Sequence, residues 1–135
     1  MQITGIEVIR RNPGVAAGVV AGEKIELTYG DTLRVNVSFD YRGLGMSVRL
    51  YGAIGQVYWP TGRFDPILQN EVSIDLPESM EFTPCERSVD IPITSDISPK
   101  SDYDLRVKFP DYLDAGQPIE NNVIDIVGAP PTYEL

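Results

Sequence analysis

The stretch that decides the fold is ISPKSDYDLRVKF, residues 97–109. From residue 102 onward, polar residues alternate with apolar ones, which are Tyr103, Leu105, Val107 and Phe109. A period of two is typical of a strand with one buried face. The preceding residues, 98–101, form a polar cluster that favours a turn. We therefore predict a central strand of a β-sandwich, in which the Tyr103 ring is buried and its hydroxyl bonds backbone near the turn, locking the corner between two sheets.

The same alternation recurs along the chain. The longest run covers residues 33–41, whose inward side chains are predicted to be Leu33, Val35, Val37, Phe39 and Tyr41. Shorter runs lie at residues 3–8, 25–29, 46–50, 72–76, 89–93 and 122–127. The parity changes between residues 50 and 57, which requires a bulge or a strand break. Residues 63–70 and 78–86 are predicted to be connections, and Pro92 indicates an edge strand because proline cannot donate to a ladder.

These runs predict the fold class. They amount to about eight strands separated by turns rich in Gly, Pro and Asp, and no segment has a helical period over ten residues. We predict an all-β fold, an Ig-like antiparallel β-sandwich of about 7–8 strands in two sheets. The length of 135 residues favours one domain, which we place at residues 1–128 with a C-terminal tail at 129–135.

The charge of the chain restricts its partners. The net charge is −9, which argues against nucleic acid and against anionic membrane surfaces, since both bind clustered Lys and Arg. Residues 1–64 hold seven basic and five acidic residues, and residues 65–135 hold four basic and fifteen acidic ones. The acidic half is predicted to be a solvated face, or else a docking face for a basic partner or for calcium. No apolar run approaches the roughly 20 residues that span a bilayer.

The residue types available limit the chemistry. Histidine is absent and Cys85 is the single cysteine. This excludes a Ser-His-Asp triad, a Cys-His pair, a cysteine zinc site and an internal disulfide. We expect no enzymatic activity and no cofactor. Because Ile3 already belongs to a predicted strand, no signal peptide is expected ahead of the fold. The chain is then cytoplasmic or virion-associated, or extracellular if a signal was removed.

Three sets of residues are candidate sites. The aromatic residues Tyr58, Trp59 and Phe64 bracket a Pro-Thr-Gly turn. Flat rings at such a turn can stack on a sugar or anchor a protein partner. Alternatively, Trp59 belongs to the core of the sandwich. Residues 15–22 are uncharged and apolar, which predicts a loop or edge segment covering the sandwich, or a self-association segment. The candidate contact residues of that segment are Val15, Val19 and Val20.

The third set is a group of carboxylates. Asp111, Asp114 and Glu120 lie in one predicted loop beside two asparagines. Oxygen ligands of this kind suit calcium, although the spacing matches no EF-hand loop. A solvated loop without metal is the alternative interpretation.

Some stretches resemble known sandwich modules. Residues 30–39, GDTLRVNVSF, resemble the second strand of bacterial Ig-like modules. The sequence ISP followed by YDLRV, within residues 97–107, resembles the corner and sixth strand of fibronectin-type-III and related domains. Glu-Asn-Asn at residues 120–122 resembles the stretch before the final strand of bacterial cell-adhesion-related (CARDB-like) domains. The resemblance implies binding or spacing rather than catalysis. Residues 15–22 have no place in the usual pattern.

Together these observations predict a non-catalytic Ig-like protein-interaction or structural module in a larger assembly such as a virion or a surface structure, with a protein partner or a second copy. The alternative is a carbohydrate-binding sandwich that uses the aromatic loop at residues 58–64. The exposure of Trp59 separates the two, because a buried ring favours the first and a flat exposed ring favours the second.

Overall fold

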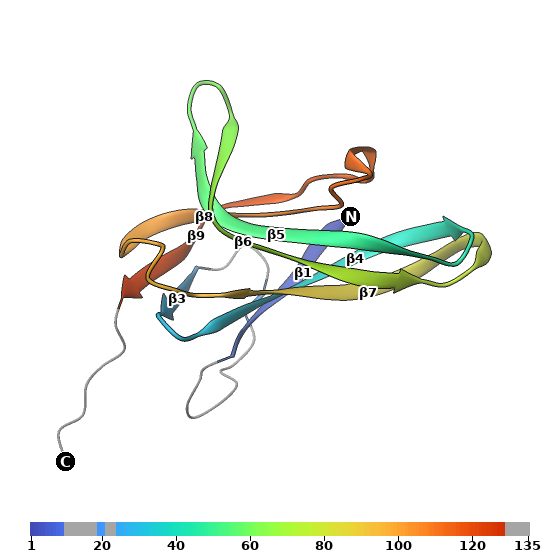
Figure 1. The fold of residues 1–135 in the computed structure, drawn as a ribbon. Helices are drawn as coiled ribbons and strands as arrows, with labels where there is room; N and C mark the ends of the chain where they lie inside the picture. Colours follow the sequence, from blue (N-terminus) through green and yellow to red (C-terminus); the bar gives the residue numbers. More distant parts are fainter. Residues whose placement is uncertain (10–18, 21–23, 129–135) are drawn as a thin grey trace, which may run out of the picture.

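A computed structural model describes residues 1–9, 19–20 and 24–128. The predicted tail at residues 129–135 lies outside the described residues. Within them the chain forms nine strands and one short 3-10 helix (Figure 1). The elements are β1 Gln2–Ile9, β2 Val19–Val20, β3 Ile25–Thr28, β4 Thr32–Gly43, β5 Met46–Tyr58, β6 Arg63–Leu76, β7 Ser79–Pro92, β8 Lys100–Lys108, η1 Leu113–Ala115 and β9 Ile119–Gly128.

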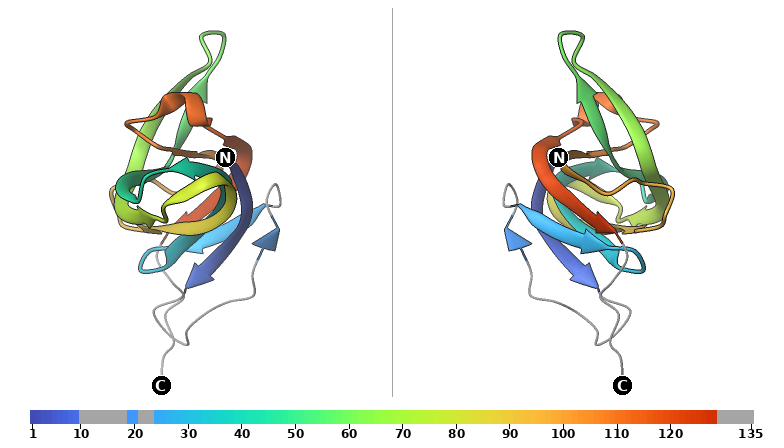
Figure 2. Two further views of the ribbon diagram at one scale, coloured as in Figure 1. Left: turned by 90° about the vertical axis from the view of Figure 1, so that its right-hand side faces the viewer. Right: turned by 90° about the vertical axis from the view of Figure 1, so that its left-hand side faces the viewer.

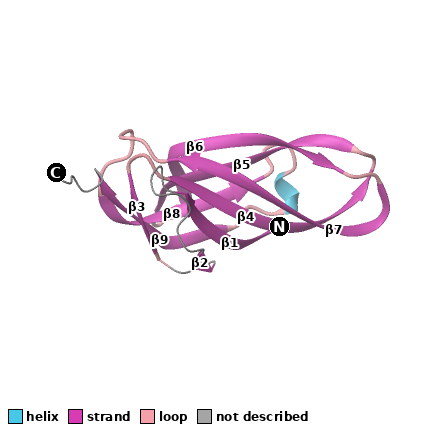
Figure 3. Cartoon of the chain, turned by 90° about the horizontal axis from the view of Figure 1, so that it is seen from below, coloured by secondary structure: helices cyan, strands magenta, loops and turns pink. Residues whose placement is uncertain are grey.

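The strands form two sheets, which confirms the prediction of an all-β sandwich. One sheet has the order β2-β1-β4-β7 and the other has the order β3-β9-β8-β5-β6. Figure 3 shows β2 beside β1, at the edge of the first sheet. One pair departs from the predicted antiparallel pattern, because β3 pairs with β9 in parallel. Parallel pairing is available here because β3 and β9 are far apart in the sequence and no hairpin joins them.

The core lies where the alternating strands face each other. Leu33, Val35 and Val37 of β4 are fully buried, as the alternation predicts. Leu105 of β8 and Ile124 of β9 in the opposite sheet are buried in the same cluster. Phe39 and Tyr41, further along β4, are only partly buried, because the end of this strand runs toward an open cavity rather than into the core.

The predicted tyrosine corner is confirmed. Tyr103 is buried, and its hydroxyl donates to the Ser98 carbonyl oxygen at 2.7 Å. The Tyr29 hydroxyl donates to the adjacent carbonyl oxygen, that of Ile97, also at 2.7 Å. Two tyrosines therefore hold successive carbonyls of the connection that crosses from β7 in one sheet to β8 in the other. Burial raises the pKa of the Tyr103 hydroxyl.

Two predicted connections are wrong. Residues 63–70 belong to β6, and residues 79–86 of the second connection belong to β7. Most of their side chains are exposed on both faces, so no buried face imposes a period of two on the sequence. β5 and β6 form one long hairpin, whose ladder runs from Met46↔Leu76 to Tyr58↔Arg63.

The predicted change of parity in β5 is a bulge. The register of the β5–β6 ladder shifts between Ile54 and Gly55. A Cβ atom at Gly55 would lie 2.0 Å from the Asp65 carbonyl oxygen, so the close approach of the two strands requires glycine. The pairing of β5 with β8 also ends at Gly55, and Figure 1 shows the β5–β6 hairpin bending away from the sheet beside β8.

The edge position predicted from Pro92 is also confirmed, because β7 is an edge strand of the first sheet. Side chains bridge β7 to β6, the edge of the other sheet. Asn70 donates its amide to the Asp90 carbonyl oxygen at 2.8 Å, and Arg87 donates to the Asp75 carbonyl oxygen at 2.8 Å. These bonds occupy backbone acceptors that would otherwise be open to another chain.

Candidate functional site

The β5–β6 hairpin extends beyond the sandwich as an arm. β5 pairs with β8 only over residues 51–55, whereas its ladder with β6 continues to Tyr58↔Arg63. We call residues 56–66 the arm. Figure 2 shows the arm projecting from the two layers in both side views. Its tip is therefore the part of the described chain best placed to enter another molecule.

Trp59 lies at the tip of the arm and is 90% exposed. The interpretation of Trp59 as a core residue is wrong, because the hairpin carries it past the last strand that could cover it. The tip is a tight turn in which the Gly62 amide and the Thr61 hydroxyl both donate to the Tyr58 carbonyl oxygen, at 2.8 and 3.2 Å. Tyr58 beside Trp59 is half-exposed. Its hydroxyl lies 3.5 Å from the Asp65 carboxylate.

Phe64, the third predicted aromatic residue, does not join the other two at the tip. It is only 8% exposed, and it pairs with Val57 in the ladder. The Arg106 guanidinium lies 5.7 Å from the centre of its ring. The three aromatic residues therefore do not form one platform; Phe64 fastens the base of the arm and Trp59 with Tyr58 forms its tip.

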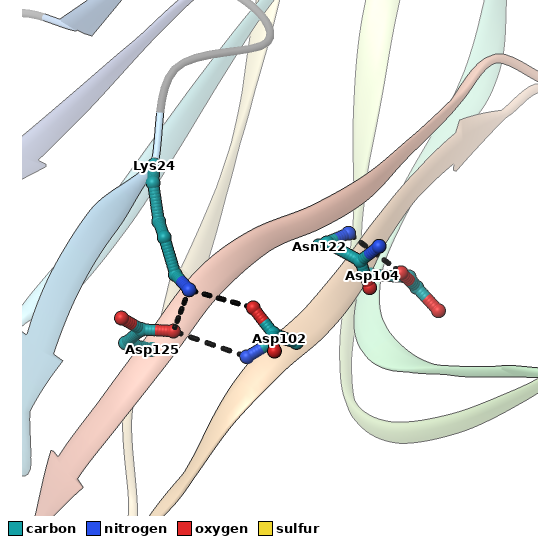
Figure 4. Close-up of polar contacts among 5 residues, drawn as sticks. All are labelled: Lys24, Asp102, Asp104, Asn122 and Asp125. Carbon is teal, nitrogen blue, oxygen red and sulfur yellow. Dashed lines mark hydrogen bonds and ion pairs between the residues drawn. The ribbon is translucent and has the colours of Figure 1, made fainter.

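Asp104 also fixes the base of the arm. Its buried carboxylate accepts the Val57 amide at 2.7 Å and the Asn122 amide at 2.8 Å, the second of which is drawn in Figure 4. Hydrogen bonds from backbone N–H groups to a carboxylate are about twice as strong as neutral ones. One side chain of β8 thus joins the arm to β9.

A second polar cluster lies beside this one in Figure 4. The Lys24 ammonium lies 2.6 Å from Asp102 and 3.3 Å from Asp125, and the Asp102 amide donates to the Asp125 carboxylate at 3.0 Å. Hydrogen bonding to Asp102 raises the pKa of Lys24. The three residues come from neighbouring segments of one sheet and satisfy each other, so their role is structural.

A hollow lies at the opposite end of the β5–β6 ladder. It is a cavity of about 400 Å³, which we call the groove, and its apolar and aromatic lining includes Phe39, Tyr41, Met46, Leu76, Phe82 and Tyr112. Its floor includes the edge-to-face pair of Phe39 and Phe109, with ring centres 5.1 Å apart. Phe82 is 65% exposed at the rim, with the Arg42 guanidinium 4.7 Å from its ring centre.

Two carboxylates also line the groove, those of Asp40 and Asp114. Within the part of the chain that the structure describes, neither takes part in an ion pair. The sequence did not reveal the groove because its wall is assembled from five separate elements. The one signal was Phe82, a large apolar residue in the segment 78–86, which was predicted to be an acidic loop.

The apolar segment at residues 15–22 is described only at Val19 and Val20. These two residues form β2 and pair with Ile6 and Gly5 of β1. The interpretation as an edge segment holds for them, since they cover the open edge of β1. Val15 lies outside the described residues.

The calcium candidates do not come together. Asp111 forms a bidentate pair with Arg49, at 2.7 and 3.1 Å, and this hydrogen bonding lowers the pKa of Asp111. Asp114 lies in η1 at the groove, and Glu120 belongs to β9. Among residues 1–9, 19–20 and 24–128, no three or more acidic, cysteine or histidine side chains form a group that could hold a metal ion.

The comparisons with known proteins identify no family. No family model matches the chain, and no curated protein is similar to it. In the described ranges no helix has the length and apolar character needed to cross a membrane.

Proposed function

We propose that this chain is a non-catalytic protein-interaction module that inserts the Trp59 side chain into a partner protein. The observation that carries the proposal is the 90% exposure of Trp59 at the tip of a projecting arm. An aromatic side chain covers about 150–250 Å². At about 25 cal/mol per Å², its burial contributes several kcal/mol to binding. Tryptophan is among the residues most enriched at the energetic centres of interfaces.

The base of the arm supports the same proposal. The bulge at Gly55, the buried ring of Phe64 and the two amide bonds to Asp104 set the direction of the arm before any partner arrives. A fixed binding element loses little conformational entropy on association, which raises affinity for a given contact area. A fixed anchor of this kind suits a subunit of a larger assembly, such as a virion or a surface structure.

The proposal is tested by recovering partners of a tagged chain from the cells in which it is made. We expect a partner, which can be an untagged copy of the chain itself, to copurify with the parent and to be lost with Trp59→Ala. The matched control is Val127→Ala, because Val127 is another exposed apolar residue, on β9 and away from the arm. Identical sets of recovered proteins for the parent and Trp59→Ala would contradict the proposal.

A carbohydrate-binding role is the second candidate. An exposed Trp59 is the outcome predicted from the sequence for this role and not for the protein-interaction role. The carbohydrate role stands second because the three aromatic residues on which it depends do not form one platform. Phe64 cannot contribute to a sugar platform, because it is buried. The contact surface is then limited to Trp59 and Tyr58. A glycan array separates the two roles: binding of a defined sugar that is lost with Trp59→Ala but kept with Val127→Ala supports the carbohydrate role.

A further inference from the structure

We propose that the groove receives the arm tip of a second copy of this chain, so that copies join head to tail. This inference rests on the proposed function of the arm, and it names the partner. The tip supplies an exposed anchor, Trp59. The groove supplies an apolar cavity of about 400 Å³ that no described residue fills.

The two surfaces lie at opposite ends of one ladder. Met46 and Leu76, the first pair of the β5–β6 ladder, line the groove, and the last pair, Tyr58 and Arg63, adjoins the tip. Twelve residue steps of β5 separate the ends, which is about 40 Å of strand at about 3.3 Å per step. Because the arm points away from the sandwich (Figures 1 and 2), Trp59 cannot reach the groove of its own chain. A second chain is required.

The size and the lining of the groove suit an indole. Its volume falls within the range of about 300–1,000 Å³ that is usual for binding pockets. Phe39, Tyr41, Phe82 and Tyr112 surround it with aromatic rings. Aromatic rings pack favourably edge-to-face or offset, so Trp59 would meet partners of its own kind. Insertion would also cover Phe82, which is now largely exposed.

The charges at the two ends are complementary. Arg63 is exposed beside the tip and, among the described residues, forms no ion pair. The groove presents the two carboxylates of Asp40 and Asp114. Two cations also lie at the groove. The Arg42 guanidinium lies over the Phe82 ring, and the N-terminal ammonium of Met1 donates to the Ala115 carbonyl oxygen at 3.0 Å. An arm that enters the groove with Arg63 directed toward Asp40 and Asp114 brings opposite charges together, which favours this orientation over others.

A contact between two different surfaces of the same chain is heterologous. Repeated contacts of this kind close into a ring or continue as a filament, rather than stopping at a symmetric dimer. The arm and the groove can therefore be inactivated separately, in two variants that are then mixed. A copy without a working arm still has a groove, and a copy without a working groove still has an arm.

The test is sedimentation velocity over a range of protein concentrations. We expect the parent to form species larger than a dimer, and we expect Trp59→Ala and Phe82→Glu each to weaken association by at least about tenfold. An equimolar mixture of the two variants should form a 1:1 dimer and nothing larger. Val127→Glu, an exposed apolar-to-acidic change away from both surfaces, should associate like the parent.

A charge exchange provides a second test if Phe82→Glu does not fold. Arg63→Glu alone and Asp114→Arg alone should each weaken association, because both residues are exposed and each change places like charges at the contact. The chain that carries both changes should associate like the parent.

A parent that stays monomeric at every concentration overturns the inference. So does a mixture of Trp59→Ala and Phe82→Glu that stays monomeric while the parent associates, because the contact is then not between arm and groove. The failure of this inference is distinguishable from failure of the proposed function. A monomeric parent that captures a different protein through Trp59 refutes self-insertion and supports the anchor role, whereas a parent that captures nothing through Trp59 refutes both.

Discussion

The Tyr103 hydroxyl donates to the Ser98 carbonyl oxygen across five residues, at 2.7 Å. This bond fixes the end of the connection between the two sheets to the first inward residue of β8. The Tyr29 hydroxyl, in the turn that follows β3, bonds the preceding carbonyl, that of Ile97, so two tyrosines hold the connection. The corner leads directly into β8, the central strand of its sheet.

Tyr103→Phe is expected to keep the fold and to lower the free energy of unfolding by about 1 kcal/mol, the usual contribution of one hydrogen bond. The measurement is urea denaturation followed by circular dichroism. Tyr112→Phe is the control, because Tyr112 is exposed. Equal midpoints for Tyr103→Phe and the parent would refute the role of the hydroxyl.

Alkaline pH is expected to destabilise the protein partly through the same residue. Burial raises the pKa of Tyr103 above its ordinary value of 10.0. The contribution to stability is therefore complete below that value and is lost as the pH rises through the folded-state pKa, because the unfolded chain releases the proton first. We expect the fall in stability above pH 10.0 to be shallower for Tyr103→Phe than for the parent. Parallel curves for the two proteins would exclude this contribution.

Val37→Asp is expected to prevent folding. Val37 is completely buried in the middle of β4, and an unpaired carboxylate at that place costs several kcal/mol, comparable to the whole stability of a small domain. Val127→Asp, at an exposed position of β9, should fold. A cooperative unfolding transition with native circular dichroism for Val37→Asp would show that this face is not the core.

Asp104→Ala is expected to loosen the arm. The change leaves the amides of Val57 and Asn122 without their acceptor, at a cost of about 1–3 kcal/mol. Hydrogen exchange at the Val57 amide should accelerate with it. Asp102→Asn is the control: it removes the charge of one exposed partner of Lys24, and asparagine tolerates the positive φ of 67° at that position. Unchanged exchange at Val57 in Asp104→Ala would mean that the carboxylate does not fix the arm.

The protein is expected not to bind nucleic acid at physiological salt. The net charge of −9 repels phosphates, and too few clustered cations are present to release counterions. A gel-shift titration with single- and double-stranded DNA and RNA at micromolar protein checks this expectation. A shifted band that persists at physiological salt would contradict it.

The sequence predicted the parts of the fold where burial alternates. The alternation through Leu33, Val35 and Val37 placed β4 correctly, and the polar turn before Tyr103 predicted the corner and its hydrogen bond. The change of parity before Val57 predicted the bulge. In each case the packing of a buried face leaves a period in the residues themselves.

The site was harder to predict because its parts leave no such period. Residues 63–70 of β6 and 79–86 of β7 are mostly exposed, so the sequence predicts connections there and strands only in the second half of each element. A lone Trp59 fits a core or a surface equally well, and what exposes it is how far the β5–β6 ladder runs beyond β8. That length depends on pairing between strands and not on the local residues. The groove draws its wall from distant segments, which only the folded chain brings together.

The role of Trp59 as an exposed anchor is tested by the fluorescence of its indole, because Trp59 is the only tryptophan in the chain. In dilute solution its emission should be that of an indole in water, and acrylamide should quench it freely, because the ring is 90% exposed. When the chain associates with a second copy or with another partner, the emission of Trp59 should shift to shorter wavelengths and its quenching by acrylamide should fall. The control Val127→Glu should show the same two changes. Two results would contradict the role of Trp59 as an exposed anchor that a partner buries. One is an indole that is already shielded in the dilute monomer. The other is an indole that remains fully quenchable in the assembled state.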